Sequence, residues 1–409
     1  MRIAIVGTGV SGLVVGHLLH PKHDVTVFEA RDRIGGHVNT VRFDDGSREW
    51  SVDTGFIVYN EANYPLFTRL LSQLDVPTQP TAMSFSVRCD RTGLEYNGST
   101  MRQLFVQKRN LLSPGYYGMI RDILRFNRNA PAAVRNGSAG MSLGEYLNEG
   151  GYSSRLADHY IVPMGSALWS MPRSRVLEMP AEFFVRFFEN HGMLTVDDRP
   201  EWRVVQGGSE RYVEALVGAF RDRIRTSTPV KSVRRDSDRV VVNGEDFDHV
   251  VMACHSDQAL GMLEDPTTDE RQILGALPYQ TNDVVLHTDT SVLPRRKRAW
   301  GAWNYHIAGK EDAPATVTYD MNILQTLQAD QTYCVTLNPP DQLDPARVLY
   351  ETRFSHPLYT PNAAVAQGRW SEISGLNRTH FCGAYWGFGF HEDGVRSGIA
   401  VASMFGAEL

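Results

Sequence analysis

The chain has 409 residues, of which 42% are hydrophobic and 22% are charged, and a formal net charge of −6. These values are typical of a globular enzyme with two domains, and they exclude a protein whose whole surface binds nucleic acid. The four cysteines form no CxxC pair, so neither a zinc site nor a disulfide framework is predicted. A strand expected from Arg2 leaves no room for a signal peptide, and no apolar run approaches the ~18 residues that span a bilayer. We therefore expect a cytoplasmic protein; peripheral contact with the inner membrane face stays open.

The first predicted elements are a strand and a helix joined by the run Gly7-Thr8-Gly9-Val10-Ser11-Gly12. Gly7 permits a tight turn, Gly9 lets the backbone approach a pyrophosphate, and Gly12 lets the helix pack closely on the strand. The N–H groups and the positive end of the helix would then face the phosphates. The run therefore indicates a dinucleotide-binding turn. Its cofactor-binding candidates are Gly7, Gly9, Val10, Ser11 and Gly12.

A second predicted strand ends at Glu29, 17 residues after Gly12, where an acid can accept hydrogen bonds from a ribose diol. The acid disfavours a 2′-phosphate, so NADP is the least expected ligand. A further glycine pair, Gly35-Gly36, brings bare backbone close to the same pyrophosphate, and Arg33 adds positive charge. An ordinary NAD dehydrogenase has no use for this pair, so the pattern favours FAD.

The run Glu29-Ala30-Arg31-Asp32-Arg33-Ile34-Gly35-Gly36-His37 resembles the second signature of the flavin amine oxidase superfamily. That superfamily includes monoamine oxidases, protoporphyrinogen oxidases and phytoene desaturases, and most members carry Arg at the position of His37. The resemblance implies FAD as the cofactor and adds Ala30, Arg31 and His37 to the candidates that bind it. It also implies a mixed α/β fold, with a Rossmann-like FAD-binding domain and a discontinuous substrate-binding domain.

The next segment, Val52-Asp53-Thr54-Gly55-Phe56, follows a predicted hairpin. The superfamily's matching segment runs beside the flavin, which implies that Thr54, Gly55 and Phe56 line the ring with their backbone. A helix is expected from Tyr64 to Leu74, because its apolar residues recur at helical spacing. From about Val76 the pattern changes, and we expect the chain to enter the substrate domain there.

Residues 101–135 are rich in basic side chains for an acidic protein, with Asp122 as their single acid. Arg121, Arg125 and Arg128 are expected on the helix face opposite an apolar stripe, which gives a basic amphipathic helix. Such a face is either an ordinary solvated surface or a site that attracts anionic lipid headgroups or an acidic substrate. A second basic cluster, residues 295–298, could join the first in space.

Two segments are expected to bear on the substrate. Phe183, Phe184, Phe187 and Phe188 form a stripe at helical spacing, which indicates a packed core or the wall of a pocket for a long apolar substrate. Further along the chain, Trp303, Tyr305 and His306 cluster, and could form a wall facing the flavin. A lone histidine is more often structural than catalytic.

The chain returns to the FAD domain over residues 201–258. A strand is expected from Thr226 to Val233, and the resemblance implies that Val230 pairs its backbone with the adenine. Ala253 provides the small-residue end of a later strand beside the cofactor.

The stretch from His380 to Val395 precedes a helix expected from Arg396 to Phe405. The N–H groups of Gly394 and Val395 would bind the flavin pyrimidine oxygen, and the helix end would stabilise negative charge on a reduced flavin. Asp393 would hold ribityl or phosphate-side groups.

Aromatic and glycine residues precede that helix. Gly383 is a further cofactor candidate, but Ala384 follows it where the superfamily commonly has Glu, so the carboxylate contact with the ribityl chain is missing or moved. Tyr385 and Trp386 could supply part of an aromatic cage for a neutral amine.

The resemblance covers nearly the whole chain. Its closer match is a bacterial subgroup of amine-oxidase-like NAD/FAD-binding proteins linked to cyclopropane-fatty-acid-synthase-like enzymes, seen in residues 53–60, Trp303-Asn304-Tyr305 and 390–394. It implies an FAD-binding domain of residues 1–75, 201–258 and 371–409. The substrate-binding domain would then comprise residues 76–200 and 259–370.

Several functions stay open on the sequence alone. The first is an FAD-dependent oxidoreductase that removes a hydride from an apolar substrate, such as a fatty-acyl or lipid desaturase. The alternatives are an amine oxidase, a redox-neutral flavin-dependent double-bond isomerase, and a non-enzymatic flavin-binding protein. We expect a small apolar or acyl substrate, no nucleic-acid partner and no metal. The fold does not determine the substrate, the electron acceptor or the oligomeric state.

Overall fold

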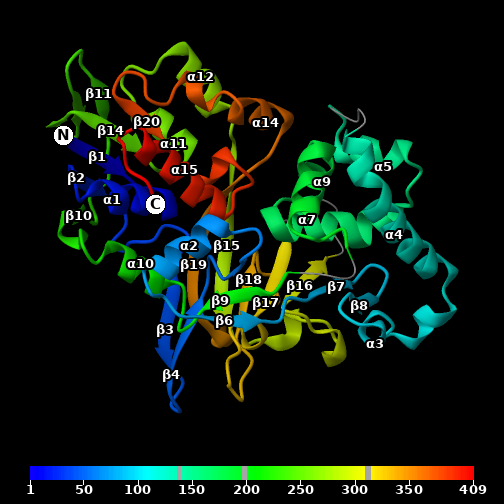
Figure 1. The fold of residues 1–409 in the computed structure, drawn as a ribbon. Helices are drawn as coiled ribbons and strands as arrows, with labels where there is room; N and C mark the ends of the chain where they lie inside the picture. The colour runs from blue at the N-terminus through cyan, green and yellow to red at the C-terminus, as the bar shows by residue number, and fades with distance from the viewer. Residues whose placement is uncertain (136–139, 196–199, 309–314) are drawn as a thin grey trace. The chain divides into compact units, whose positions relative to one another are not determined.

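The computed structural model describes residues 1–135, 140–195, 200–308 and 315–409 (Figure 1). They form two compact units, each built from segments far apart in the sequence. The first unit comprises Met1–Gln79, Val205–Tyr279 and Asn362–Leu409, and the second comprises Pro80–Val204 and Gln280–Pro361. No helix of the described residues is long and apolar enough to cross a membrane.

The first unit is built on a parallel sheet of five strands in the order β10-β2-β1-β14-β20. Their bounds are Arg2–Val6 for β1, Asp24–Phe28 for β2, Ile224–Arg225 for β10, His249–Met252 for β14 and Thr379–Phe381 for β20. The first and last strands of the chain thus lie in one sheet, and Figure 1 shows blue and red segments together. Parallel pairing sends the carboxyl ends of the strands, and the turns after them, to one edge.

Both faces of this sheet are covered, as alternation along a strand requires. Ile3 and Ile5 pack with helices α1 (Val10–Leu19), α10 (Glu210–Val217) and α15 (His391–Ser403). Ala4 and Val6 pack on the other side, with a small antiparallel sheet of β11 (Val233–Arg235), β12 (Val240–Val242) and β13 (Glu245–Phe247). This burial fixes the edge at which the glycine turn emerges.

The predicted strand Thr226–Val233 is wrong. The chain forms the short β10 at Ile224–Arg225, a loop, and then β11 at Val233–Arg235. Ser227 in that loop has a positive φ of 50°, and Pro229 has no N–H to give to a ladder, so a continuous strand is disfavoured there.

The predicted domain boundaries also differ from the two units, because residues 259–279 and 362–370 belong to the first unit. Helices α11 (Ser256–Met262) and α12 (Thr268–Gly275) bury Ala259, Ile273 and Leu274 in the cluster that holds Met252 of β14. This burial holds residues 259–279 against the parallel sheet. Their position in the sequence does not reveal it.

The second unit is built on a seven-stranded sheet in the order β19-β15-β18-β17-β16-β7-β8. The strands are Val348–Pro357, Tyr279–His287, Cys334–Leu337, Thr316–Asp320, Trp303–Ile307, Phe85–Cys89 and Leu94–Asn97. β7 and β16 pair in parallel, whereas β7 and β8 form a hairpin.

The second unit also contains a helical layer. The long helix α4 (Pro114–Arg135) packs against α9 (Ala181–Asn190), and α5 (Leu143–Glu149) starts at the capping box of Ser142 and Glu145. Phe184, Phe187 and Phe188 of α9 are fully buried, which agrees with the core interpretation of the phenylalanine stripe.

Candidate functional site

The glycine turn leaves open space where a ligand would bind. Gly7 has φ 107°, a conformation that side chains disfavour, and donates its N–H to the Phe28 carbonyl at 2.8 Å. A Cβ on Gly12 would overlap the Gly7 carbonyl oxygen, so this residue must be glycine for α1 to start there. A Cβ on Gly9, by contrast, would meet no protein atom within 4 Å. Gly9 is therefore not needed by the protein's own packing, and its bare backbone suits close approach by a phosphate.

Helix α1 begins immediately after that space. Its first intrahelical hydrogen bond runs from the Leu13 N–H to the Gly9 carbonyl at 3.0 Å. The N–H groups of Val10, Ser11 and Gly12 precede it and have no intrahelical acceptor. Together with the helix dipole they form a place for an anion. The Ser11 hydroxyl contacts the Cys382 thiol, so the side chain packs inward while its N–H belongs to the open first turn.

Glu29 stands at the end of β2 as a buried carboxylate. One oxygen accepts from the N–H of Thr8 at 3.0 Å and from its hydroxyl, and the other accepts from the Arg31 N–H at 2.9 Å. These bonds orient the carboxylate while leaving acceptor capacity, since a carboxylate has about four lone-pair sites. The position therefore suits recognition of a ribose diol. Ala30, the next residue, is exposed.

The second glycine pair closes on the first turn. Gly36 has φ 60°, and a Cβ on it would lie 2.8 Å from the Gly9 Cα. Arg33 donates to the carbonyls of Val38 at 2.7 Å and of Gly36 at 2.9 Å. Its guanidinium thus holds the loop in shape and keeps a positive charge beside it. The two glycine runs meet at one place, as a pyrophosphate site requires.

The segment Thr54-Gly55-Phe56 lies beside this loop. The Thr54 N–H donates to the Asn39 carbonyl at 2.8 Å, and the Phe56 N–H donates to the His37 carbonyl at 3.0 Å. The Phe56 ring stacks on His391 of the C-terminal motif with centroids 3.5 Å apart. The structure therefore brings this segment, His37 and the C-terminal motif into one region of the first unit.

His391 is a residue whose role the sequence did not reveal. Its Nε2 lies 2.8 Å from the Tyr212 hydroxyl, and burial lowers the pKa of the imidazole to about 3. The ring is therefore neutral at physiological pH and joins α15, α10 and the Phe56 segment. The contact links residues far apart in the chain, so no sequence spacing indicates it.

The roles expected for Gly394 and Val395 need correction. Helix α15 begins at His391, five residues before the predicted start, and the Gly394 N–H donates to the Phe390 carbonyl at 3.1 Å. The first-turn N–H groups without an intrahelical acceptor are instead those of His391, Glu392 and Asp393. A Cβ on Gly394 would lie 2.5 Å from Val10 Cγ1, so Gly394 allows α15 to pack on the start of α1.

Asp393 serves the helix end. Its carboxylate accepts from the N–H groups of Phe388 at 3.0 Å and Phe390 at 3.1 Å, and pairs with Arg396 at 3.0 Å. Burial raises its pKa to about 6. These bonds occupy the carboxylate within the protein, so the ribityl contact predicted for Asp393 has no support in this geometry.

The remaining cofactor candidates line the same sheet edge. Val230 is buried in the loop after β10; in that loop the Thr228 N–H donates to the Glu29 carbonyl at 2.8 Å. A Cβ on Gly12 would lie 3.0 Å from the Ala253 Cβ, which explains the small residue at the end of β14. The backbone N–H of Gly383 donates to the Ser397 hydroxyl oxygen at 3.0 Å.

The aromatic candidates are divided between the two units. Tyr385 and Trp386 lie in the first unit on the 3-10 turn η8 (Ala384–Trp386), with ring centroids 5.1 Å apart. Trp303, Tyr305 and His306 lie in the second unit on β16. Residues that alternate along a strand face opposite sides, so His306 points away from the side of Trp303 and Tyr305.

His306 has a structural environment. Its Nε2 lies 2.6 Å from the Asp90 carboxylate, and Asp90 also accepts from Arg88 at 3.0 Å. Burial lowers the pKa of His306, although its hydrogen bond to Asp90 acts in the opposite direction and raises the pKa. The imidazole thus ties β16 to the end of β7 (Phe85–Cys89), which supports the structural interpretation over a catalytic one.

Comparison with known proteins identifies the family. Residues 10–342 match the model of the family described as flavin containing amine oxidoreductase. The chain belongs to this family. It is a flavin-dependent oxidoreductase of the amine oxidase superfamily, and its cofactor is FAD. The site fits FAD: it has open space at Gly9, an oriented carboxylate at Glu29 and free N–H groups at the start of α1.

Solved structures share the fold over the full chain at low sequence identity. Cyclohexylamine oxidase from Brevibacterium oxydans IH-35A is 16% identical and covers 99% of each chain, with a TM-score of 0.69. A putative protoporphyrinogen oxidase from Exiguobacterium sp. 255-15 is 18% identical and covers 99% of this chain and 98% of its own, with a TM-score of 0.71. A fatty acid isomerase from P. acnes that produces CLA is 14% identical at the same coverage, with a TM-score of 0.70. At these identities the likeness concerns the fold alone.

A curated relative matches only a short stretch. The flavin-dependent L-tryptophan oxidase RebO of Lentzea aerocolonigenes is 44% identical over 55 residues, which is 13% of this chain and 12% of that protein. The chain thus matches about an eighth of that relative's length.

When bound, FAD supplies the two-electron acceptor, and the chain supplies binding and orientation. Gly9 and the first turn of α1 would hold the pyrophosphate, and Glu29 the adenosine ribose.

Proposed function

We propose that the protein is an FAD-dependent dehydrogenase that removes a hydride from an apolar, acyl-type substrate. The observation that carries this proposal is the packing of Tyr385 and Trp386. These two residues are the first unit's candidates for an aromatic cage, which would enclose the neutral amine of an amine oxidase substrate.

The two rings contact one another, with centroids 5.1 Å apart and planes tilted by 42°. Two rings that enclose a substrate group must each stand a van der Waals contact away from it, about 3.5 to 4 Å, so their centroids would be at least about 7 Å apart. Tyr385 is also 3% exposed and packs with Leu277 and Ala363 in a small core. The two rings therefore pack on one another and leave no gap between them for an amine.

The second unit contains further aromatic side chains that pack on one another. Trp303 of β16 packs edge-on against Tyr319 at 5.2 Å, and Tyr305 on the same side of the strand is buried. On α9, Phe183 stacks on Tyr359 with centroids 4.6 Å apart. Of these residues Trp303 and Phe183 are half-buried, and apolar rings of this kind suit a long hydrocarbon group better than a small cation. The fatty acid isomerase among the structural neighbours is consistent with acyl chemistry on this fold.

Amine oxidation is the second candidate. The family description and the cyclohexylamine and tryptophan oxidases among the similar proteins favour it. Double-bond isomerisation differs from both because it consumes no electron acceptor.

A matched pair of substrates separates these functions. The holoenzyme is mixed anaerobically with an unsaturated long-chain fatty acid and, separately, with the primary amine of the same carbon chain. We expect the visible flavin absorbance to bleach with the acid only, and mass spectrometry to find a product that has lost two hydrogens. Bleaching with the amine only would contradict the proposal. A shifted double bond at unchanged mass, without consumption of an acceptor, would replace it with isomerisation.

A further inference from the structure

The second unit carries a concentration of exposed apolar side chains. Five of the ten large hydrophobic residues exposed in the described chain lie between positions 101 and 124: Met101, Leu111, Leu112, Tyr117 and Leu124. Leu112 is 88% exposed and Met101 is 69% exposed. Scattered single residues of this kind are normal on a surface, but a cluster of them marks an interaction site.

Contacts join the elements that carry these side chains. The Tyr117 hydroxyl donates to the Leu111 carbonyl at 3.2 Å, which joins the 3-10 turn η1 (Lys108–Leu112) to α4. The Tyr117 ring also lies 5.7 Å from Phe105, just after α3 (Met101–Leu104). On α4, Tyr117 and Leu124 recur at helical spacing on the face opposite the buried Met119 and Phe126.

Cations occupy the same face. Arg121 and Arg128 alternate with Tyr117 and Leu124 along α4, and both arginines are exposed. Neither they nor Arg102 and Lys108 form an ion pair within the described part of the chain. Asp122, the single acid of residues 101–135, is buried, accepts from the Ser153 N–H at 3.1 Å and lies 3.5 Å from Arg125. The exposed charge of the face is therefore positive throughout.

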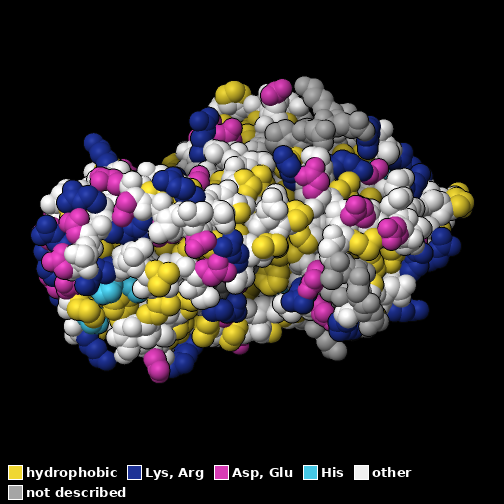
Figure 2. All heavy atoms as spheres, turned by 90° about the horizontal axis from the view of Figure 1, so that it is seen from above, with side chains coloured by type: hydrophobic (Ala, Val, Ile, Leu, Met, Phe, Trp, Pro, Cys, Tyr) yellow, Lys and Arg dark blue, Asp and Glu magenta, His cyan; other side chains and the backbone are white. Residues whose placement is uncertain are grey.

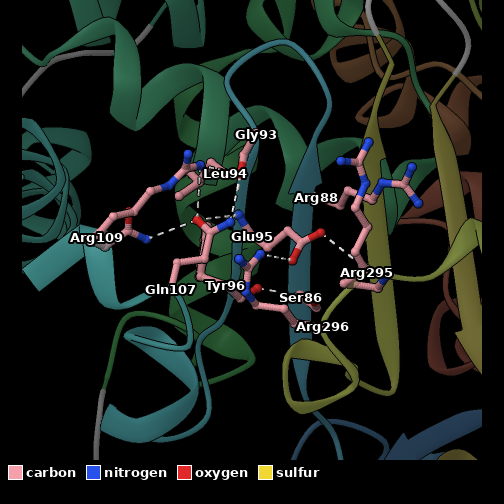
Figure 3. A network of polar contacts seen from close by, with 12 residues as sticks. Ser86, Arg88, Gly93, Leu94, Glu95, Tyr96, Gln107, Arg109, Arg295 and Arg296 are labelled. Carbon is pink, nitrogen blue, oxygen red and sulfur yellow. Dashed lines mark hydrogen bonds and ion pairs between the residues drawn. The ribbon is translucent and has the colours of Figure 1, made fainter.

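The second basic cluster joins this surface, as Figure 3 shows. Glu95 of β8 accepts from the Arg295 N–H at 2.9 Å and from the Arg296 guanidinium at 3.0 Å, while its own N–H donates to Gln107 at 3.2 Å. The turn η5 (Lys297–Ala299) then packs beside α3. Lys297 and Arg298, both exposed, thus add two cations at the edge of the apolar cluster.

We propose that this surface docks on an anionic phospholipid bilayer. We call it the docking patch and define it as the exposed side chains of residues 101–128 together with Lys297 and Arg298. Apolar tips would enter the boundary between headgroups and acyl chains, and the guanidinium and ammonium groups would remain at headgroup level. In Figure 2, yellow side chains bordered by dark blue ones stand at the right-hand edge, where Figure 1 places the α3–α4 segment.

The combination favours a bilayer over other polyanions. A nucleic acid would attract the cations but would leave Leu111 and Leu112 against phosphates and water. Each basic residue near an anionic membrane surface contributes about 1 kcal/mol, which is about a fivefold change in partition, and the apolar tips add to it. The proposal concerns a surface of the second unit and does not depend on which substrate the enzyme oxidises.

Co-sedimentation with vesicles tests the proposal on the FAD-loaded full chain. We expect binding to vesicles of phosphatidylcholine with phosphatidylglycerol, and at least tenfold weaker binding to phosphatidylcholine alone. Leu111→Ser with Leu112→Ser, and separately Arg121→Glu with Arg128→Glu, should each weaken the anionic partition at least tenfold. Arg125 is left intact because it stacks on Tyr152 at 3.9 Å and bonds the Gly151 carbonyl.

Matched controls lie in the first unit. Leu376→Ser removes an exposed leucine, and Lys22→Glu with Lys231→Glu reverses two exposed charges, all outside the docking patch. These variants should bind vesicles as the wild type does. Absence of wild-type binding to anionic vesicles, or equal losses in the patch and control variants, would overturn the proposal. A solution dimer that Leu111→Ser with Leu112→Ser dissolves, without vesicle binding, would assign the patch to a second copy of the chain instead.

Discussion

At the scale of single residues, Gly9 decides whether a cofactor can approach the turn. Its backbone adopts φ −64° and ψ 168°, which any residue can take, and a Cβ there would meet no protein atom within 4 Å. The usual reasons for a glycine, strain and internal crowding, are both absent at this position. The space beside it therefore matters for the ligand and not for the fold.

We predict that Gly9→Val abolishes FAD binding and leaves the folded protein intact. The valine side chain would project into the space of the pyrophosphate, and its Cβ would meet no protein atom within 4 Å. FAD content measured after purification, together with thermal unfolding of the apoprotein, checks both parts. Gly261→Val is the control, because a Cβ there also meets nothing within 4 Å, and it lies on α11. A Gly9→Val protein that purifies with one FAD per chain would contradict the assignment of the turn.

Asp53 gives a prediction about pH. Its carboxylate is fully buried and accepts from the Ser209 N–H at 2.9 Å and the Thr40 hydroxyl at 2.5 Å, and burial raises its pKa from 3.8 to about 6. A carboxyl whose pKa is raised by folding binds its proton more tightly in the folded state. Its contribution to stability is therefore full below pH 4 and is lost as the pH rises through 6.

The pKa difference of about 2 corresponds to roughly 3 kcal/mol. We predict that the free energy of unfolding of the wild type, relative to Asp53→Asn, falls by up to about this amount between pH 4 and pH 7. Urea unfolding of both proteins across this range measures the difference. Subtracting the variant removes the opposite effect of His391, whose lowered pKa makes stability rise with pH. A difference that is constant with pH would show that Asp53 titrates normally.

At the scale of elements, one carboxylate joins the C-terminal helix to α2 (Pro65–Gln73). Glu392 of α15 accepts from the N–H groups of Leu66 at 3.1 Å and Phe67 at 3.0 Å, which are first-turn donors of α2 with no intrahelical acceptor. The carboxylate is buried. A cap supplied from more than 300 residues away holds two segments of the first unit in register.

We predict that Glu392→Ala lowers the free energy of unfolding by about 1 to 3 kcal/mol, because the buried N–H of Phe67 and the half-buried N–H of Leu66 lose their acceptor. Glu392→Gln, which keeps one acceptor oxygen, should cost less. Denaturant titration of both variants measures the effect, and Glu408→Ala, at an exposed glutamate, should leave stability within about 0.5 kcal/mol of the wild type. An unchanged midpoint for Glu392→Ala would mean that α2 does not depend on this cap.

Elements with a local cause could be predicted from the sequence. The strand, turn and helix at the N-terminus follow from an apolar run and from the spacing of the glycines, and the capping box at Ser142 follows from side-chain chemistry. The strand expected at Thr226–Val233 is absent, because Ser227 has a positive φ and Pro229 has no N–H to donate to a neighbouring strand. The C-terminal helix was placed too late, because Asp393 caps the helix at Phe390 through its own side chain.

At the scale of the whole molecule, long-range packing set the limits of prediction. Residues 259–279 join the first unit through Ile273 and Leu274, which bury against a sheet that the chain left earlier. The stack of Phe56 on His391 joins residues far apart in the chain, so the spacing of residues in the sequence does not reveal it either. The cofactor could be predicted because its site is a local motif. The substrate could not, since its recognition depends on side chains from several segments.

We infer that the Gly9 turn and Glu29 hold FAD in this chain. The measurement that tests it most directly is the stoichiometry of flavin released from the purified protein, identified by mass spectrometry after denaturation. We expect one FAD per chain in the wild type, or uptake of one FAD from solution, and none in Gly9→Val. A wild-type protein that neither contains nor takes up FAD would contradict it.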